Sequence, residues 1–404
     1  GNANDIFNLT TNIDRPPLAI MLQTARQYYT NTASGVNNDP ANGNTPSSSY
    51  DLQVVSIFGG GHITDNTGAF IQWTGNKYGG PSDANRYTAA SGIDNTEFRY
   101  ADRILTGDSD LLYGAYINNR VTMSDVWNSQ ENWTSDWIGY FNGGFNGSTG
   151  LAPSTFLQSG SSQHSVAGVG AYLFKDKTWY GELGVYKSVT HGPLSIITAG
   201  NGPGASTLID TSPYIRLAYN KEWGPHSFQV GAHGMVAYAH NNDILTNTYS
   251  DWSGSVNTYR DAGLDAQYQY VLEPHYFAAH FRYTHESMNN NATIGANPTD
   301  TLNETWADAT YIYQAKYGAM LFYHGATGSN DAVLYSSSPT GSPNWQSWMP
   351  SLFWAPVQNV RIGYMYTFYT QLGGTSGNSL TAGTSTSLAP HDFNTSMLYA
   401  TIIY

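Results

Sequence analysis

Several stretches of this chain alternate apolar and polar residues with the period of two that a β-strand imposes. Within residues 276–284, one parity holds Phe277, Ala279, Phe281 and Tyr283, and the other holds His280, Arg282 and Thr284. Residues 228–238, 261–270, 306–316 and 360–369 alternate in the same way. The pattern predicts strands with one apolar face and one polar or small face.

Sixteen candidate strands follow one another between residues 18 and 404, and the gaps between them are alternately long and short. Short connections are predicted at residues 61–66, 106–110, 176–177, 222–225, 273–274, 317–318 and 355–358. The long gaps include residues 30–49 and the insertion at 121–161. An even number of strands with short turns at one end and long loops at the other is typical of an outer-membrane β-barrel.

The fold predicted from these patterns is all-β: a single 16-stranded antiparallel transmembrane β-barrel over residues 18–404, with short periplasmic turns and long extracellular loops. Residues 1–17 are predicted to form a periplasmic N-terminal segment. A slip of the register by one residue would turn charged side chains toward lipid, at roughly 2–4 kcal/mol for each Arg or Lys near the midplane. Residues 51–59 and 165–174 are ambiguous, and Asp102, which shares a parity with Phe98 and Tyr100, is expected near an interface.

Composition supports the same prediction. Only 11% of the residues are charged, against about 25% in soluble domains, yet the mean hydropathy is −0.38. The chain has 31 Tyr and 11 Trp, and we expect the tyrosines to form the girdles at the two membrane interfaces. The net charge of −13 argues against a nucleic-acid partner. The predicted location is the outer membrane of a Gram-negative bacterium, with outer-membrane lipid as a partner and an oligomer as an open possibility.

Both ends of the sequence fit this location. The last residues set Leu398, Ala400, Ile402 and Tyr404 against Thr401 and Ile403 and end in an aromatic residue. Such a C-terminal strand resembles the signal that outer-membrane proteins present to their assembly machinery. The chain begins at Gly1 without Met, which is expected of a processed exported protein and equally of a trimmed one.

Five stretches of sequence resemble the barrel part of the outer-membrane cytochrome-porin fusions, a family that includes single-haem iron-oxidising cytochromes. They are FRYADR (98–103), NNRVTMSDVWNS (118–129), GPHSFQVGAHGMVA (224–237), YRDAGLDAQYQY (259–270) and EPH (273–275). RPPLAIM (15–21) resembles the segment that opens the barrel in that family. The resemblance implies electron transfer through a haem, which in those proteins is carried by an N-terminal Cys-x-x-Cys-His segment.

This chain has no cysteine, so it can bind no c-type haem covalently and forms no disulfide. Two alternatives remain for a haem. His233 and His280 both lie on the polar parity and could ligate one non-covalently, or a partner could supply it, such as a c-type cytochrome or a periplasmic electron carrier. Otherwise these two residues are solvated histidines of the lumen, and His226 and His275 belong to the periplasmic turns.

The polar parity of the strands predicts the residues that line the barrel interior. They are Arg216, His233, Asp261, Asp265, His280, Arg282, Asp308, Lys316 and Arg361. The first hypothesis for function is a porin-like channel for passive diffusion of ions or small solutes. The alternative is a barrel that sheathes a trans-outer-membrane electron conduit.

Enzyme motifs are missing from the sequence: it contains no GxSxG elbow, HExxH, P-loop or Rossmann glycine pattern, so we predict neither catalytic residues nor a metal site. Two long loops carry further expectations. Residues 121–161 include Trp127, Trp133, Trp137 and Tyr140, and they either fold into the lumen as a constriction or pack as an extracellular cap. Residues 373–389 are rich in Gly, Ser and Thr and contain no Lys or Arg.

Overall fold

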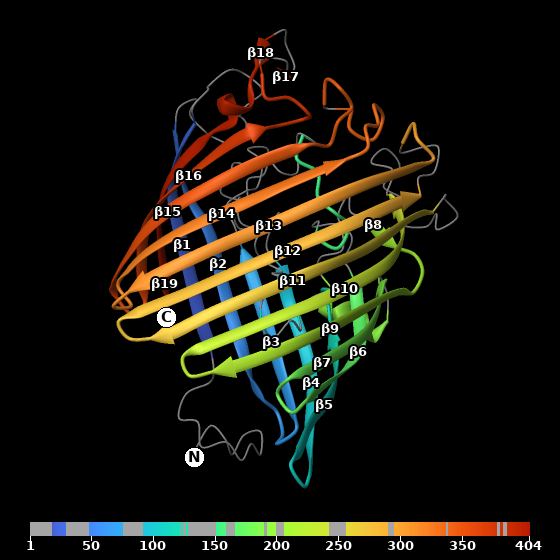
Figure 1. The fold of residues 1–404 in the computed structure, drawn as a ribbon, viewed down its shortest axis with the longest axis vertical. Helices are drawn as coiled ribbons and strands as arrows, with labels where there is room; N and C mark the ends of the chain where they lie inside the picture. The colour runs from blue at the N-terminus through green and yellow to red at the C-terminus, as the bar shows by residue number, and fades with distance from the viewer. Residues whose placement is uncertain are drawn as a thin grey trace.

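The computed structural model describes residues 18–29, 48–75, 92–121, 123, 127, 151–158, 166–189, 192–198, 206–241, 256–289, 295–336, 338–377, 380–382 and 386–404. The predicted N-terminal segment 1–17 lies outside these residues. Sixteen long antiparallel strands close into a barrel, as predicted (Figure 1). They are β1 (Leu18–Tyr29), β2 (Ser48–His62), β3 (Thr67–Gly75), β4 (Gly92–Thr106), β5 (Ser109–Asn118), β6 (Val166–Lys175), β7 (Trp179–Ser188), β9 (Ser212–Trp223), β10 (His226–Asn241), β11 (Asn257–Leu272), β12 (His275–Asn289), β13 (Thr299–Tyr313), β14 (Tyr317–Gly328), β15 (Trp345–Val357), β16 (Val360–Gln371) and β19 (Thr395–Ile403).

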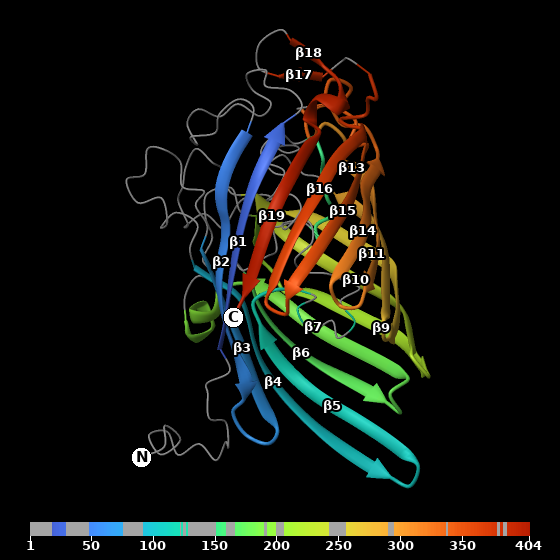
Figure 2. The same cartoon turned by 90° about the vertical axis from the view of Figure 1, so that its left-hand side faces the viewer.

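The barrel is closed by the pairing of its first strand with its last. β19 lies beside β1 in Figure 2, and the two strands pair from Met21 opposite Ile403 to Tyr29 opposite Thr395. At the edge of this seam, Ile20 and Tyr404 exchange two backbone hydrogen bonds of 2.8 and 2.9 Å. Closure leaves none of the sixteen long strands at an open edge of the sheet, which is the condition for a sheet to sit in lipid.

Minor elements extend the wall on the side of the long loops. β8 (Ser206–Leu208) pairs with the upper end of β10 and continues the wall beyond β9, while β17 (Leu380–Ala382) and β18 (Thr386–Leu388) form a separate hairpin in the last long loop. Two 3₁₀ turns, η3 (Pro193–Ile197) and η4 (Pro390–Phe393), lie in long loops as well. Within the described residues, no helix has the length and hydrophobicity needed to cross a membrane.

The alternation of turn lengths is confirmed, but one predicted turn is wrong. β13 ends at Tyr313 and β14 begins at Tyr317, so the turn spans residues 314–316 and not 317–318. Gln314 and Ala315 make this turn with positive φ values of 53° and 54°, which the sequence does not signal because neither residue is glycine. Gly318 instead belongs to β14, where a Cβ would lie 2.0 Å from the ring of Phe353.

The two faces of the wall differ as the sequence pattern predicts. On β11 and β12 the outward Leu264 and Phe281 are 57% and 44% exposed, whereas the inward Asp265 and Arg282 are each 1% exposed. The same alternation settles the ambiguous strand β6, where Val169 and Leu173 point outward and Tyr172 points inward. Such an exterior is apolar around the barrel, as lipid requires.

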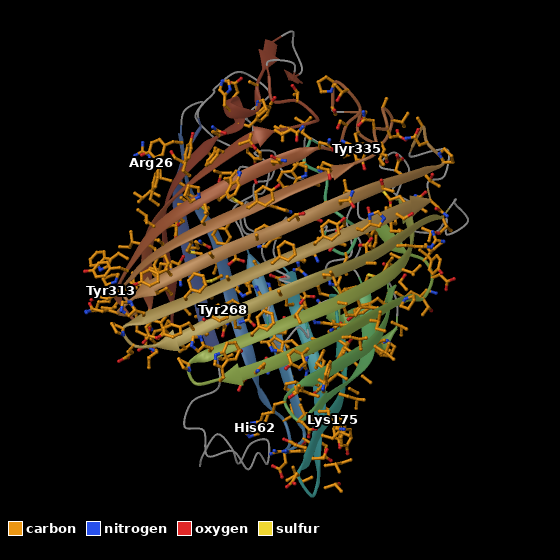
Figure 3. All side chains as sticks on the ribbon, in the orientation of Figure 1. Arg26, His62, Lys175, Tyr268, Tyr313 and Tyr335 are labelled. Carbon is orange, nitrogen blue, oxygen red and sulfur yellow. The ribbon has the colours of Figure 1, made fainter. Side chains whose placement is uncertain are left out.

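Aromatic side chains gather at the short-turn end, where Tyr268 and Tyr313 are labelled in Figure 3. His226 stacks on Trp223 and its Nδ1 lies 2.7 Å from the hydroxyl of Tyr268, and His275 makes the same 2.7 Å contact with Tyr311. Both histidines therefore belong to the turn region, as predicted. Asp102 also lies toward this end, where the hydroxyls of Tyr100 and Tyr113 donate to it at 3.1 and 3.3 Å.

The tyrosines do not all serve as girdles. Tyr116, Tyr172, Tyr180, Tyr186 and Tyr214 point into the barrel and are buried, so the expectation that assigned the tyrosines to the interfaces is wrong for these five. Glycines on neighbouring strands make room for them. A Cβ at Gly168 would lie 2.1 Å from the ring of Tyr186, and one at Gly170 would lie 2.3 Å from that of Tyr116.

Candidate functional site in the barrel lumen

A buried cluster of polar side chains lies on the inner wall of β9, β10 and β11. Arg216 donates through Nη1 and Nη2 to the two carboxylate oxygens of Asp265, at 2.5 and 2.7 Å. The same carboxylate lies 3.2 Å from Nδ1 of His233 and accepts from the amide of Gln229 at 3.1 Å. A bidentate guanidinium–carboxylate pair with further donors is among the stronger polar contacts available to a protein.

A second group continues around the wall on β12, β13 and β14. Arg282 stands directly opposite Asp265 across the β11–β12 pair, and its guanidinium lies 5.8 Å from the ring centre of Trp306. His324 lies between the rings of Trp306 and Trp345, and its Nε2 is 2.6 Å from Glu304 Oε1. Opposite charges thus alternate along the wall.

The remaining predicted residues divide between the wall and its rim. His280 lies on β12 with Nδ1 at 3.1 Å from Asp308, which is buried on β13. Arg361 has the inward parity of β16, but it is exposed at the short-turn end, with its guanidinium 4.5 Å from the ring centre of Phe353. Lys316 is not on the wall: it lies exposed in the turn between β13 and β14, so its assignment to the lumen is corrected.

The described part of the long β5–β6 loop lies inside the barrel. Its residues 154–157 are held by three carboxylates on adjacent strands: Leu157 N donates to Asp261 at 2.7 Å, Phe156 N to Glu286 at 2.5 Å, and Thr155 N to Glu304 at 2.9 Å. Glu304 also accepts from the hydroxyls of Ser154 and Thr155 at 2.6 and 2.8 Å.

Packing complements these hydrogen bonds. Phe156 stacks on Tyr259 with ring centres 4.9 Å apart, and Trp345 Nε1 donates to the carbonyl of Pro153 at 2.8 Å. Hydrogen bonds to charged groups are worth about 1.5–3 kcal/mol each, so this stretch is firmly attached to the wall. Of the two alternatives for the loop, folding into the lumen is confirmed for residues 153–157.

Trp127 extends the contact between the same loop and the wall. It packs edge-on against Phe174 and Tyr180, with ring centres 5.7 and 5.2 Å apart, and its Nε1 donates to Asn220 at 3.2 Å. All three partners point inward from β6, β7 and β9. Trp133, Trp137 and Tyr140 lie outside the described residues.

Glu182 occupies the centre of the inward tyrosines. It accepts from the hydroxyls of Tyr116 and Tyr180 at 2.7 and 2.9 Å, and the hydroxyl of Tyr186 donates to that of Tyr116 at 3.4 Å. Glu182 is 3% exposed and stands opposite Arg216 across the β7–β9 pair. The tyrosine hydroxyls thus fix the orientation of a buried carboxylate on the inner wall.

Sequence reasoning found the wall but missed most of what holds the loop. Glu286, Glu304, His324 and Glu182 were not predicted, although each lies on the inward parity of its strand. Extending the inward parity of β13 upward from Asp308 reaches Trp306 and then Glu304, so the signal was present. Strand parity does not show where the β5–β6 loop lies, so the sequence could not indicate that Glu286 and Glu304 bind the loop.

The contacts of His233 and His280 bear on whether these two histidines could ligate a haem. Both ring nitrogens of His233 are within hydrogen-bond distance of other groups, Asp265 and Thr284, and each of these contacts is 3.2 Å. His280 contacts Asp308 through Nδ1. Among the residues that the structure describes, no group of three or more histidine or acidic side chains is arranged to hold a metal ion.

Neither a family model nor a curated protein matches this sequence. Solved structures do match. The outer membrane channel DcaP of Acinetobacter baumannii is 12% identical, with 96% of each chain covered and a TM-score of 0.54. OmpF of Salmonella typhi, in complex with daunomycin, is 12% identical over 96% of this chain and 97% of the other, with a TM-score of 0.48. An anion-selective porin from Comamonas acidovorans is 11% identical over 96% and 98%, also with a TM-score of 0.48.

The likeness to DcaP concerns the fold, and it agrees with the features of the barrel itself. A closed antiparallel barrel of 16 strands with an apolar exterior and aromatic side chains at its rim is built for lipid. Barrels of this kind span bacterial outer membranes. The chain is therefore an outer-membrane β-barrel protein.

Proposed function

We propose that this protein is an outer-membrane channel for passive diffusion of ions or small solutes, narrowed by the inward-folded β5–β6 loop. The main observation in support is that residues 154–157 are hydrogen-bonded to Asp261, Glu286 and Glu304 on the inner wall. A 16-stranded barrel is too wide to be filled by wall side chains alone. A loop held against one side of the lumen narrows a passage while the polar wall keeps it wet.

The proposal also draws on the structures that match. The DcaP structure, which has the same fold, is described as an outer membrane channel. The electron-conduit alternative draws no such support, and both ring nitrogens of His233 already contact Asp265 and Thr284.

Conductance across a planar lipid bilayer tests the proposal. Purified protein without added cofactor should give discrete current steps, and its absorption spectrum should contain no Soret band. A protein that inserts and conducts no ions would overturn the channel. A Soret band that persists through purification would favour the conduit instead.

A variant of the loop anchor sharpens this test. In Glu304→Gln the side chain keeps its size but loses its charge and one acceptor oxygen, so the hydrogen bonds to Ser154, Thr155 and His324 weaken. We expect larger and noisier current steps because residues 154–157 detach from the wall. Asp108→Asn, in the exposed turn between β4 and β5, is the matched control and should conduct like the unmodified protein. Equal step sizes in all three proteins would contradict a narrowing role for the loop.

A further inference from the structure

Lysines gather at the short-turn end of the barrel. Four of the five lysines among the described residues lie there: Lys175 and Lys177 at the β6–β7 turn, Lys221 near the end of β9, and Lys316 in the β13–β14 turn. All four are exposed, and none of them forms an ion pair with a carboxylate of the described residues. Figure 3 labels Lys175 and, at the other end of this stretch of the rim, Tyr313. Exposed cations at a membrane interface attract an anionic lipid surface.

The carboxylates of the same stretch, from β6 to β14, do not share the outward face of the wall. Asp176, in the β6–β7 turn, accepts from Asp110 N at 2.8 Å and from the hydroxyl of Ser109 at 3.3 Å. Glu222 has the inward parity of β9, and Glu273 accepts from the hydroxyl of a tyrosine with the inward parity of β12. The lysines of β6 and β9, in contrast, have the outward parity of their strands, so they lie on the lipid side of the wall.

Two histidines stand near these lysines in matching arrangements. His226 Nδ1 lies 2.7 Å from the hydroxyl of Tyr268, and His275 Nδ1 lies 2.7 Å from the hydroxyl of Tyr311. When the phenol donates to Nδ1, the ring hydrogen of a neutral histidine is on Nε2. Neither Nε2 meets a hydrogen-bond partner among the residues that the structure describes, so each ring can donate one more hydrogen bond.

An aromatic residue links each histidine to a lysine. Trp223 stacks on His226 with ring centres 5.2 Å apart, and Lys221 Nζ lies 5.9 Å from the ring centre of the same indole. The ring centre of Tyr313 is 5.5 Å from that of His275, and the carbonyl of Tyr313 accepts from the backbone N of the lysine in the β13–β14 turn at 3.0 Å. Each set therefore combines an ammonium group, an imidazole and an aromatic ring of the kind that settles at the level of lipid headgroups.

We propose that these two sets bind the phosphate groups of anionic phospholipids in the leaflet that faces the periplasm. Lys221 with His226 forms one site, and Lys316 with His275 forms the other. An ammonium group and an imidazole N–H are donors that a phosphodiester accepts, and the short turns of such a barrel lie on the periplasmic side. Because both sites lie outside the lumen, this inference does not depend on what the barrel conducts.

Native mass spectrometry of the protein in detergent with equal amounts of phosphatidylglycerol and phosphatidylcholine measures the binding. The first two lipids to bind should be phosphatidylglycerol, with an affinity about fivefold above that of phosphatidylcholine, which is the effect of one lysine near an anionic membrane surface. Lys221→Gln and Lys316→Gln should each remove one of the two preferred sites, and the double variant should remove the preference. His226→Phe keeps a ring against Trp223 without the Nε2 donor and should weaken the first site.

Lys187→Gln is the matched control, because it removes the same exposed charge from the outward face of β7 at the opposite, long-loop end. It should leave both sites intact. Equal affinity of the unmodified protein for the two lipids would overturn the inference, whether or not any variant folds. A preference that Lys187→Gln lowers as much as Lys221→Gln does would overturn the assignment to these two sites, and one that His226→Phe leaves unchanged would overturn the role of the imidazole. Absence of conductance would overturn the channel and leave this inference standing.

Discussion

At the scale of single residues, carboxylates organise the long-loop end of this barrel both inside and outside the lumen. Outside, Asp331 in the β14–β15 loop accepts four backbone N–H groups. Val333 and Leu334 donate from the same loop at 2.8 and 2.9 Å, and Ala296 and Asn297 donate from the β12–β13 loop at 3.0 and 2.7 Å. One side chain thereby holds two neighbouring loops together.

The pKa of Asp331 predicts how this contact responds to acid. Burial alone would raise the pKa, but the four N–H groups outweigh burial and hold it well below its usual range. A depressed pKa in the folded protein means that the stabilisation is complete above the unfolded value of about 3.9 and is lost only as the pH falls through the lower, folded value. The contact should therefore survive at pH 3.

Proteolysis of the two loops tests this. Asp331→Asn replaces one acceptor oxygen by a donor and removes the negative charge, so at least one of the four hydrogen bonds is lost and the others weaken. We expect cleavage near Leu334 to be about tenfold faster in the variant, from the loss of at least one charged hydrogen bond. Pepsin at pH 3 and proteinase K at pH 7 should both show the difference. Equal cleavage of the two proteins at both pH values would contradict the role of Asp331.

At the scale of secondary-structure elements, inward tyrosines and the glycines facing them fix how β5, β6 and β7 pack. The ring of Tyr186 covers Gly168, where a Cβ would lie 2.1 Å from Cε1. Gly181, on the outward face of β7, is the natural control because its nearest neighbour, Leu217, would lie 3.6 Å from a Cβ. A methyl group would therefore clash at Gly168 and fit at Gly181.

Alanine at these two glycines should have opposite consequences. Gly168→Ala should lower the free energy of unfolding by about 1–3 kcal/mol, the usual cost of overpacking. Gly181→Ala should leave it unchanged or raise it slightly, since it restricts the unfolded chain. Urea unfolding in lipid vesicles, followed by tryptophan fluorescence, measures both. The packing described here would be contradicted if Gly168→Ala were as stable as the unmodified protein.

Prediction from sequence succeeded for the elements that lipid constrains. The alternation on β11 and β12 placed Asp265 and Arg282 inside, because a charged residue facing lipid is costly. Prediction failed at the turn after β13. Gln314 and Ala315 form this turn with positive φ, and Gly318 lies in β14, where it makes room for the ring of Phe353. Turn geometry follows from local backbone angles that non-glycine residues seldom signal.

For the site, parity gave the direction of each side chain but not its partner. Asp261, Asp265, His280 and Arg282 were all predicted to line the interior. The structure gives them different partners, which are the loop, Arg216, Asp308 and Trp306 in that order. Those partners come from distant parts of the chain. Only the closed wall and the inward loop bring them within reach.

At the scale of the whole molecule, the account depends on a closed wall with lipid on one side and the lumen on the other. The chain contains no cysteine, so single cysteines can be introduced along β12 and spin-labelled without background. Residues 277–284 span the wall between the short turn and the loop anchor. The accessibility of each label to oxygen, which partitions into lipid, reports the side on which it lies.

Oxygen accessibility along β12, measured by spin-label spectroscopy in lipid vesicles, tests this central claim most directly. We predict a period of two, with high accessibility at Phe277, Ala279, Phe281 and Tyr283 and low accessibility at Ala278, His280, Arg282 and Thr284. The reverse alternation, or a profile without a period of two, would contradict the barrel and everything built on it.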